Sequence, residues 1–163
     1  MVNRLEALGV DVVELSGGSY EAPAMQGQTR DDTTLAREAY FLEFAQALVS
    51  KTDIPLMTTG GIKRAEVAEE VIEQGCALVG LASALAITPD LAKKWQQEWA
   101  YSGIIPHCSW KDKSLASLAN MAMVRRQLRR LGNNLTTLRN PSPLWSLILD
   151  MLHRKKMTKR DVG

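Results

Sequence analysis

The sequence predicts an α/β protein with a parallel sheet in residues 1–90 and a helical extension in residues 91–163. Two observations indicate this fold class. In the first unit, short apolar or β-branched segments alternate with segments of helical periodicity, a pattern typical of parallel βαβ units. In the second unit, helical periodicity continues between loops that contain proline and glycine, and no segment has a convincing strand pattern.

Three short segments have the composition of strands that are buried on both faces of a parallel sheet. They lie at residues 10–15, 54–58 and 76–81. A parallel sheet needs cover on both faces and partners along its edges. Three strands cannot close a barrel, so the chain is expected either to be a fragment or to pair its open edges with another chain.

Helical periodicity occupies the segments between these strands. Thr33 or Thr34 can cap a helix that runs to about residue 50. A second helix is expected over residues 64–74. It should end at Gly75, because glycine is favoured immediately after a helix.

The extension is expected to be helical, with short helices after residue 83 and from Leu91. A longer helix ending at Gly132 is indicated by the spacing of Leu115, Leu118, Met121 or Ala122, Leu128 and Leu131. After a linker at 133–143, a last amphipathic helix is indicated by Leu144, Leu147, Ile148, Met151 and Leu152. Trp95, Trp99 and Trp110 are expected to anchor these helices on the sheet unit.

Three loops follow the predicted strands, at residues 16–19, 59–61 and 82–83. Ligands of parallel α/β proteins bind at the carboxyl ends of strands. The second and third loops place small residues before a helix, and bare N–H groups at such a position can bind phosphate. A Gly-Gly pair after a strand is also an ordinary tight turn, so spacing alone leaves both interpretations open.

Composition excludes several classes of protein. Cys76 and Cys108 are far apart and have no CxxC spacing, so neither a metal site nor a disulfide framework is expected, and a reducing cytoplasm is the expected compartment. Cys76 is interpreted as a small core residue. No apolar run approaches the ~20 residues of a membrane span, and the first residues do not form a signal peptide.

The net charge of +2 hides a basic C-terminal tail. Residues 121–163 hold ten Lys and Arg against two acidic residues, Asp150 and Asp161. The tail is interpreted as a solvated helix face, with an anionic partner such as nucleic acid or membrane lipid as the alternative. Trp145 is the only aromatic residue of this region, which does not favour binding of single-stranded nucleic acid.

Three groups of motifs resemble the Old Yellow Enzyme-type NADH:flavin oxidoreductases. Residues 9–18 with 34–41 are similar to the sixth βα unit of that family, and residues 55–61 to its seventh strand and phosphate loop. Residues 78–85, followed by Pro89-Asp90-Leu91, are similar to the eighth strand and the turn after it. The resemblance extends to about residue 131. It implies units six to eight of a TIM-type (β/α)8 barrel, followed by the helical extension.

The resemblance also implies the cofactors. Backbone N–H groups of Gly60 and Gly61 would bind the phosphate of FMN, with Ala82 and Ser83 opposite, and NAD(P)H would be the reductant. Many members of the family have Gly-Arg where this chain has Ala82-Ser83. A serine brings no charge, and charge-assisted hydrogen bonds are about twice as strong as neutral ones.

No catalytic residue is assigned, because the family's substrate-binding and flavin-ring contacts lie on units one to five. His107 and His153 are interpreted as surface residues, and Tyr20 as a packing residue with the mouth of a substrate site as the alternative. A small-molecule electron acceptor is implied. Three hypotheses remain: a split or truncated oxidoreductase that needs an N-terminal half-barrel chain or a second copy, a non-catalytic phosphate-binding remnant, and an interaction protein that acts through its basic tail.

Overall fold

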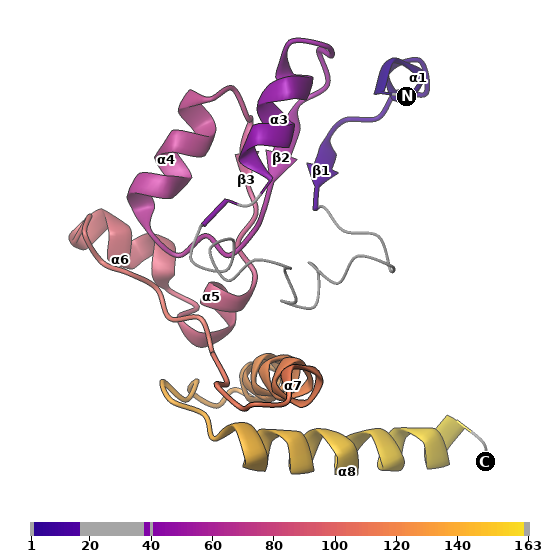
Figure 1. Ribbon diagram of the computed structural model, residues 1–163, viewed down its shortest axis with the longest axis vertical. Helices are drawn as coiled ribbons and strands as arrows, with labels where there is room; N and C mark the ends of the chain where they lie inside the picture. Colours follow the sequence, from indigo (N-terminus) through magenta and orange to yellow (C-terminus); the bar gives the residue numbers. More distant parts are fainter. Residues whose placement is uncertain (1, 17–37, 40, 162–163) are drawn as a thin grey trace.

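The computed structural model describes residues 2–16, 38–39 and 41–161 as a mixed α/β structure (Figure 1). A small parallel sheet and its helices form one end, and two long helices form the other. The elements are α1 (Val2–Glu6), β1 (Val13–Leu15), α3 (Leu42–Val49), β2 (Leu56–Thr58), α4 (Ala65–Glu73), β3 (Leu78–Val79), α5 (Ser83–Ile87), α6 (Leu91–Gln97), α7 (Lys113–Gly132) and α8 (Pro143–Asp161).

The three strands pair in the order β1-β2-β3, and both pairs are parallel. Leu15 lies opposite Thr58, and Thr58 lies opposite Val79, so the strands end together at one edge of the sheet. The three predicted strands are confirmed, although each is shorter than its apolar segment. Within the described residues, β1 and β3 are both edge strands.

The core of the sheet unit lies between the strands and helices α3 and α4. It contains Ala45 and Val71, both fully buried, and Leu56, which is 3% exposed. Cys76 belongs to the same cluster, and its burial raises the pKa of its thiol. The interpretation of Cys76 as a small core residue is therefore confirmed.

The predicted helix from Thr33 or Thr34 to residue 50 is wrong at its start. Helix α3 begins at Leu42, and residues 33–37 lie outside the described residues. Ala39 has φ 55°, in the left-handed region, so a right-handed helix cannot pass through it. The helix ends at Val49, close to the predicted end.

Helix α4 of the sheet unit and helix α6 of the extension lie close to where the sequence predicts. Helix α4 ends at Glu73, one residue before the predicted end at Gln74. Gly75 then has φ 96°, in the left-handed region. A Cβ on Gly75 would lie 2.7 Å from a methyl group of Val49. Both this clash and the positive φ angle exclude a larger residue at this position. Helix α6 begins at Leu91, as expected.

Helices α7 and α8 confirm both predicted helices of the extension and pack against each other. Polar side chains join the two helices along their seam: Arg125 and Arg129 of α7 bind Asp150 of α8, and Arg126 donates to the hydroxyl of Ser146, which is fully buried. The large apolar residues that define the two helices mostly point outward instead: Leu115, Leu118, Met121, Leu128, Leu144, Met151 and Leu152 are each 40% or more exposed. None of the described helices has the length and apolar character needed to cross a membrane.

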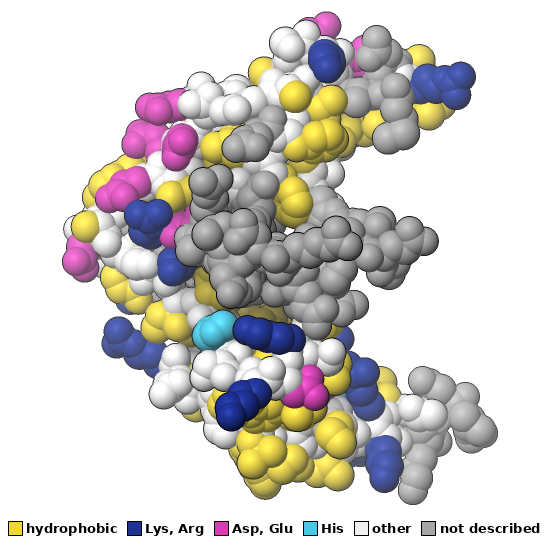
Figure 2. All heavy atoms as spheres, viewed as in Figure 1, with side chains coloured by type: hydrophobic (Ala, Val, Ile, Leu, Met, Phe, Trp, Pro, Cys, Tyr) yellow, Lys and Arg dark blue, Asp and Glu magenta, His cyan; other side chains and the backbone are white. Residues whose placement is uncertain are grey.

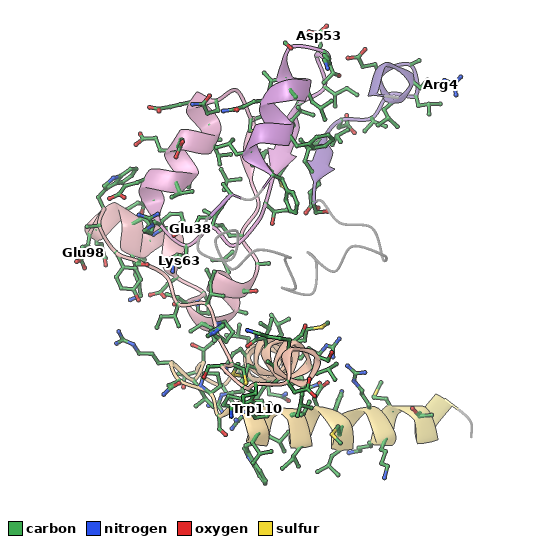
Figure 3. All side chains as sticks on the ribbon, in the orientation of Figure 1. Arg4, Glu38, Asp53, Lys63, Glu98 and Trp110 are labelled. Carbon is green, nitrogen blue, oxygen red and sulfur yellow. The ribbon has the colours of Figure 1, made fainter. Side chains whose placement is uncertain are left out.

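The contacts found for Trp95 and Trp110 lie within the extension itself, so their expected role as anchors on the sheet unit is not confirmed. Trp110 packs against a small cluster that includes Cys108 and Met123 of α7 (Figure 3). Trp99 is 52% exposed, so the prediction that it anchors the extension is wrong. The indole Nε1 of Trp95 donates to the carbonyl of Tyr101 at 3.0 Å, which closes the loop after α6.

Asp150 of α8 is the polar centre of the seam. Its carboxylate accepts from Arg129 at 2.9 Å, from Arg125 at 3.1 Å and from Arg154 at 3.1 Å, and its side chain is 5% exposed. Burial alone would raise the pKa of Asp150, but the hydrogen bonds from Arg129 and Arg125 outweigh it and lower the pKa. The ionised carboxylate therefore stabilises the helix pair.

We expect Asp150→Asn to lower the free energy of unfolding by about 2 kcal/mol at pH 7, because charge-assisted hydrogen bonds are lost. Since the folded pKa lies below the ordinary value of 3.8, the difference from wild type should persist down to that pH. It should shrink as pH falls further, through the folded pKa. Urea unfolding at several pH values measures this. Asp90→Asn is the control, because Asp90 forms only an exposed i,i+4 pair with Lys94.

Candidate functional site

The loop after β2 contains Gly60 and Gly61 in conformations that favour glycine. Gly60 has φ 129° and Gly61 has φ 68°. The carbonyl of Gly60 accepts from the N–H of Ala39 at 2.7 Å. Among the described residues, no acceptor is found for the N–H of Gly60 or of Gly61. These two donors are the ones that the sequence assigns to a phosphate.

Glu38 binds the residues that follow the two glycines, Lys63 and Arg64. One carboxylate oxygen accepts from the backbone N–H of Lys63 at 2.9 Å and of Arg64 at 3.2 Å, and the other accepts from Nε of Arg64 at 2.7 Å. The Glu38 side chain is only 7% exposed. Figure 3 shows Glu38 and Lys63 side by side at the start of α4. An internal carboxylate therefore occupies the N-terminal end of α4.

This role of Glu38 was not predicted from the sequence. A helix through residues 33–50 would place Glu38 on its surface, far from the loop after β2. The left-handed conformation of Ala39 instead ends that pattern and directs the chain toward Gly60. No signal in the local sequence marks this interaction, because its partners lie 25 and 26 residues away.

The second predicted pair follows β3. Ala82 is the residue before α5, and Ser83 is its first residue. The N–H of Gly80 donates to the carbonyl of Thr58 at 2.7 Å, and a Cβ on Gly80 would lie 2.9 Å from Cβ of Thr59. The ends of β2 and β3 are thus closely packed. The structure places both predicted pairs at the carboxyl edge of neighbouring strands.

A buried hydroxyl lies at the same edge. Thr58, the last residue of β2, is fully buried, and its Oγ1 has no hydrogen-bond partner within the described part of the chain. Buried polar groups normally have partners. This hydroxyl and the N–H groups of Gly60 and Gly61 are therefore compatible with an anionic oxygen nearby. Arg64 compensates the charge of Glu38, so the carboxylate is not an isolated negative charge.

The other candidate residues lie away from this edge or outside the described residues. Tyr20 and residues 17–19 belong to the part of the chain that is not described. His107 and His153 are exposed, as expected for surface residues. Within the described ranges, no group of three or more His, Cys, Asp or Glu side chains could hold a metal ion.

This arrangement defines a parallel α/β protein whose loops of small residues meet at the carboxyl edge of the sheet, the edge where such proteins bind ligands. No protein-family model matches the chain, and no solved structure matches it. Three relatives are informative. The NADH-dependent flavin oxidoreductase iliE of Hypocrea jecorina (strain QM6a) is 40% identical over 91 residues, covering 52% of this chain and 23% of that protein.

The NADH-dependent flavin oxidoreductase iccE of Talaromyces variabilis is 37% identical over 93 residues, covering 52% of this chain and 22% of that protein. The 4,4'-dithiodibutanoate disulfide reductase of Rhodococcus erythropolis is 31% identical over 99 residues, covering 58% of this chain and 25% of that protein. The chain therefore spans about a quarter of the length of these relatives. Over about half of its own length, the chain is thus similar to NADH-dependent flavin oxidoreductases.

The role of Glu38 can be tested without any ligand. Glu38→Gln should lower the free energy of unfolding by about 1–2 kcal/mol, because two backbone donors lose a charged acceptor. It should also speed amide hydrogen exchange at Lys63 and Arg64. Glu66→Gln is the matched control, since Glu66 is 57% exposed and lies 3.6 Å from Arg64. Equal exchange rates in the wild type and Glu38→Gln would contradict the assignment.

Proposed function

We propose that this chain is the part of an FMN-dependent NAD(P)H oxidoreductase that binds the flavin phosphate. In this proposal its three strands and their helices are units six to eight of a (β/α)8 barrel. The observation that carries it is the relation to NADH-dependent flavin oxidoreductases, joined to the glycine loop at the carboxyl edge of the sheet. The phosphate sites of such barrels often lie at the loops after strands seven and eight.

The residues of this chain would bind and orient the phosphate. Gly60 and Gly61 would donate their N–H groups, which are without partners among the described residues. Ala82 and Ser83 would supply donors from the start of α5, and the hydroxyl of Ser83 could add a neutral hydrogen bond. Glu38 keeps the following amides engaged, so the phosphate would lie on the glycine side of the loop. The flavin, when bound, supplies the redox chemistry.

Catalysis is proposed to need residues from the other five units. At the described carboxyl edge, the carboxylate of Glu38 is already engaged by Arg64 and two amides, and no side chain of this chain is assigned to catalysis. The electron acceptor would be a small molecule, such as an electron-poor alkene or a quinone. The relatives' names include a disulfide reductase, so the acceptor is not taken from any one of them.

We expect the purified chain alone to show no NAD(P)H-dependent reduction of enones or quinones. A phosphate site without a ring pocket would bury too little of the flavin to hold it, since small-molecule sites bury most of their ligand. The measurement is NAD(P)H oxidation with added FMN and each acceptor. Turnover above that of free FMN would disprove the need for a second polypeptide.

Flavin binding should return when a polypeptide that supplies units one to five of a related oxidoreductase is added. In that complex, Gly61→Val should abolish flavin retention, because a branched side chain is strained at φ 68° and intrudes where the phosphate approaches. Gly132→Val is the control, since a Cβ there meets nothing within 4 Å. Flavin fluorescence titration measures retention.

Ser83→Ala separates loss of binding from loss of folding. This substitution removes one hydroxyl and leaves the backbone unstrained, so flavin affinity should fall several-fold while thermal unfolding stays unchanged. Full flavin retention by the Gly61→Val complex would place the phosphate at another loop. Failure of the wild-type complex to retain flavin would favour a remnant without cofactor.

A further inference from the structure

Helix α8 carries an apolar face that nothing in the described structure covers. This outer face of α8 consists of Leu144, Trp145, Ile148, Met151 and Leu152, which repeat at the spacing of one side of a helix. Leu144 is 59% exposed, Trp145 51%, and Met151 and Leu152 58% each. Figure 2 shows hydrophobic side chains gathered over α8.

The orientation of α8 is fixed by its opposite side. Ser146 and Asp150 are buried against α7, where Asp150 binds Arg125 and Arg129. Rotating the helix to bury its apolar face would expose this ion network and break its hydrogen bonds. The outward direction of the apolar face is therefore a property of the fold.

The position of α8 also separates its outer face from the sheet. Helix α7 packs against α5 on one side and against α8 on the other. In Figure 1, α7 lies between α8 and the three strands. Additional strands paired with β1 or β3 would extend the sheet, and they would not cover the far side of α8.

The charge around this face has one sign. Arg154, Lys155 and Lys156 are exposed in the turns that follow the apolar residues. Asp150 is the one acidic residue between positions 143 and 158, and it is buried and paired. Along α8, the exposed surface is therefore apolar up to Leu152 and cationic from Arg154 to Lys156, and it carries no negative side chain over these residues.

We propose that α8 binds the surface of an anionic lipid bilayer through its outer face. Its apolar side chains enter the region between headgroups and acyl chains, with Trp145 at the boundary. Lys155 and Lys156 contact anionic headgroups. Helices that lie in a membrane surface combine an apolar face with lysine and arginine in this way, and each nearby basic residue strengthens the attraction. This inference goes beyond the proposed flavin-binding function and does not depend on it.

Other partners fit these observations less well. A second copy would cover the apolar residues of the outer face but leave Lys155 and Lys156 without an anionic partner, and a parallel pair would bring these cations together. A protein groove that surrounds a helix would have to displace α7 and break the bonds of Asp150. Nucleic acid would use the cations but not the aliphatic residues. The surface of a bilayer is planar, so it can bind the exposed outer face of α8 without displacing α7.

The test is flotation of the full chain with vesicles of phosphatidylcholine alone and of phosphatidylcholine mixed with phosphatidylserine. We expect binding to the mixed vesicles that weakens as salt is raised. Met151→Ser with Leu152→Ser should weaken it by about tenfold or more. Replacing Lys155 and Lys156 by Ala should weaken it by about fivefold for each lysine.

Two matched controls sit on other elements. Ile72→Ser changes an apolar residue of α4 that is 47% exposed, and Lys93→Ala removes an exposed cation of α6; both variants should bind as wild type does. A blue shift of tryptophan emission on vesicles should disappear in Trp145→Phe. The assay contains no flavin and no second polypeptide, so its failure would leave the flavin proposal untouched.

Several results would overturn the proposal. These are no binding to phosphatidylserine vesicles, equal binding to phosphatidylcholine alone, or unchanged binding by the Met151 and Leu152 double variant. Dimers in sedimentation analysis that dissociate with Leu152→Ser would assign the outer face to a second copy instead. Tighter binding to RNA than to vesicles, lost with the two lysines but not with Leu152→Ser, would assign the tail to nucleic acid.

Discussion

The conformation of the loop after β2, at the carboxyl edge of the sheet, depends on the hydrogen bonds that the carboxylate of Glu38 accepts. This carboxylate binds the amides of Lys63 and Arg64 at the start of α4, and the neighbouring Ala39 binds the carbonyl of Gly60. Two consecutive residues thus fix both ends of the loop after β2. Gly60 and Gly61, with their positive φ angles, therefore lie in a loop that is held at two points.

The carboxylate of Glu38 also decides where an external anion can bind. The positive end of a helix attracts negative charge, and at α4 that attraction is already satisfied by an internal carboxylate. A second anion at the same amides would meet Glu38 at close range. In the proposed flavin site, the donors left for a phosphate would be those of Gly60 and Gly61 and the start of α5, together with the buried hydroxyl of Thr58. The proposed phosphate site therefore excludes the amides at the start of α4, which a helix N-terminus would otherwise offer.

The sequence predicted those features that depend on neighbouring residues. The strands follow from apolar composition, and the end of α4 follows from Gly75, because each reflects a local preference. The start of α3 could not be predicted in this way, since Ala39 adopts its conformation through a bond to Gly60. The two loops of the candidate site were found from glycine and serine after strands. Glu38 was missed because its partners are distant in sequence. Periodicity also located α7 and α8, but it does not say what covers an apolar face.

The seam between α7 and α8 explains why their apolar residues stay outside. The contacts that join the two helices are made by Asp150 and its arginines and by Arg126 with Ser146. Because Asp150 is buried, its arginines must stay in place to compensate its charge, and this fixes the orientation of α8. The hydrophobic free energy of the outer face of α8 is therefore not used in folding. Burying one leucine or methionine stabilises by roughly 1.5–3 kcal/mol. That free energy remains for a partner, and the cations after Met151 favour one with a negative surface.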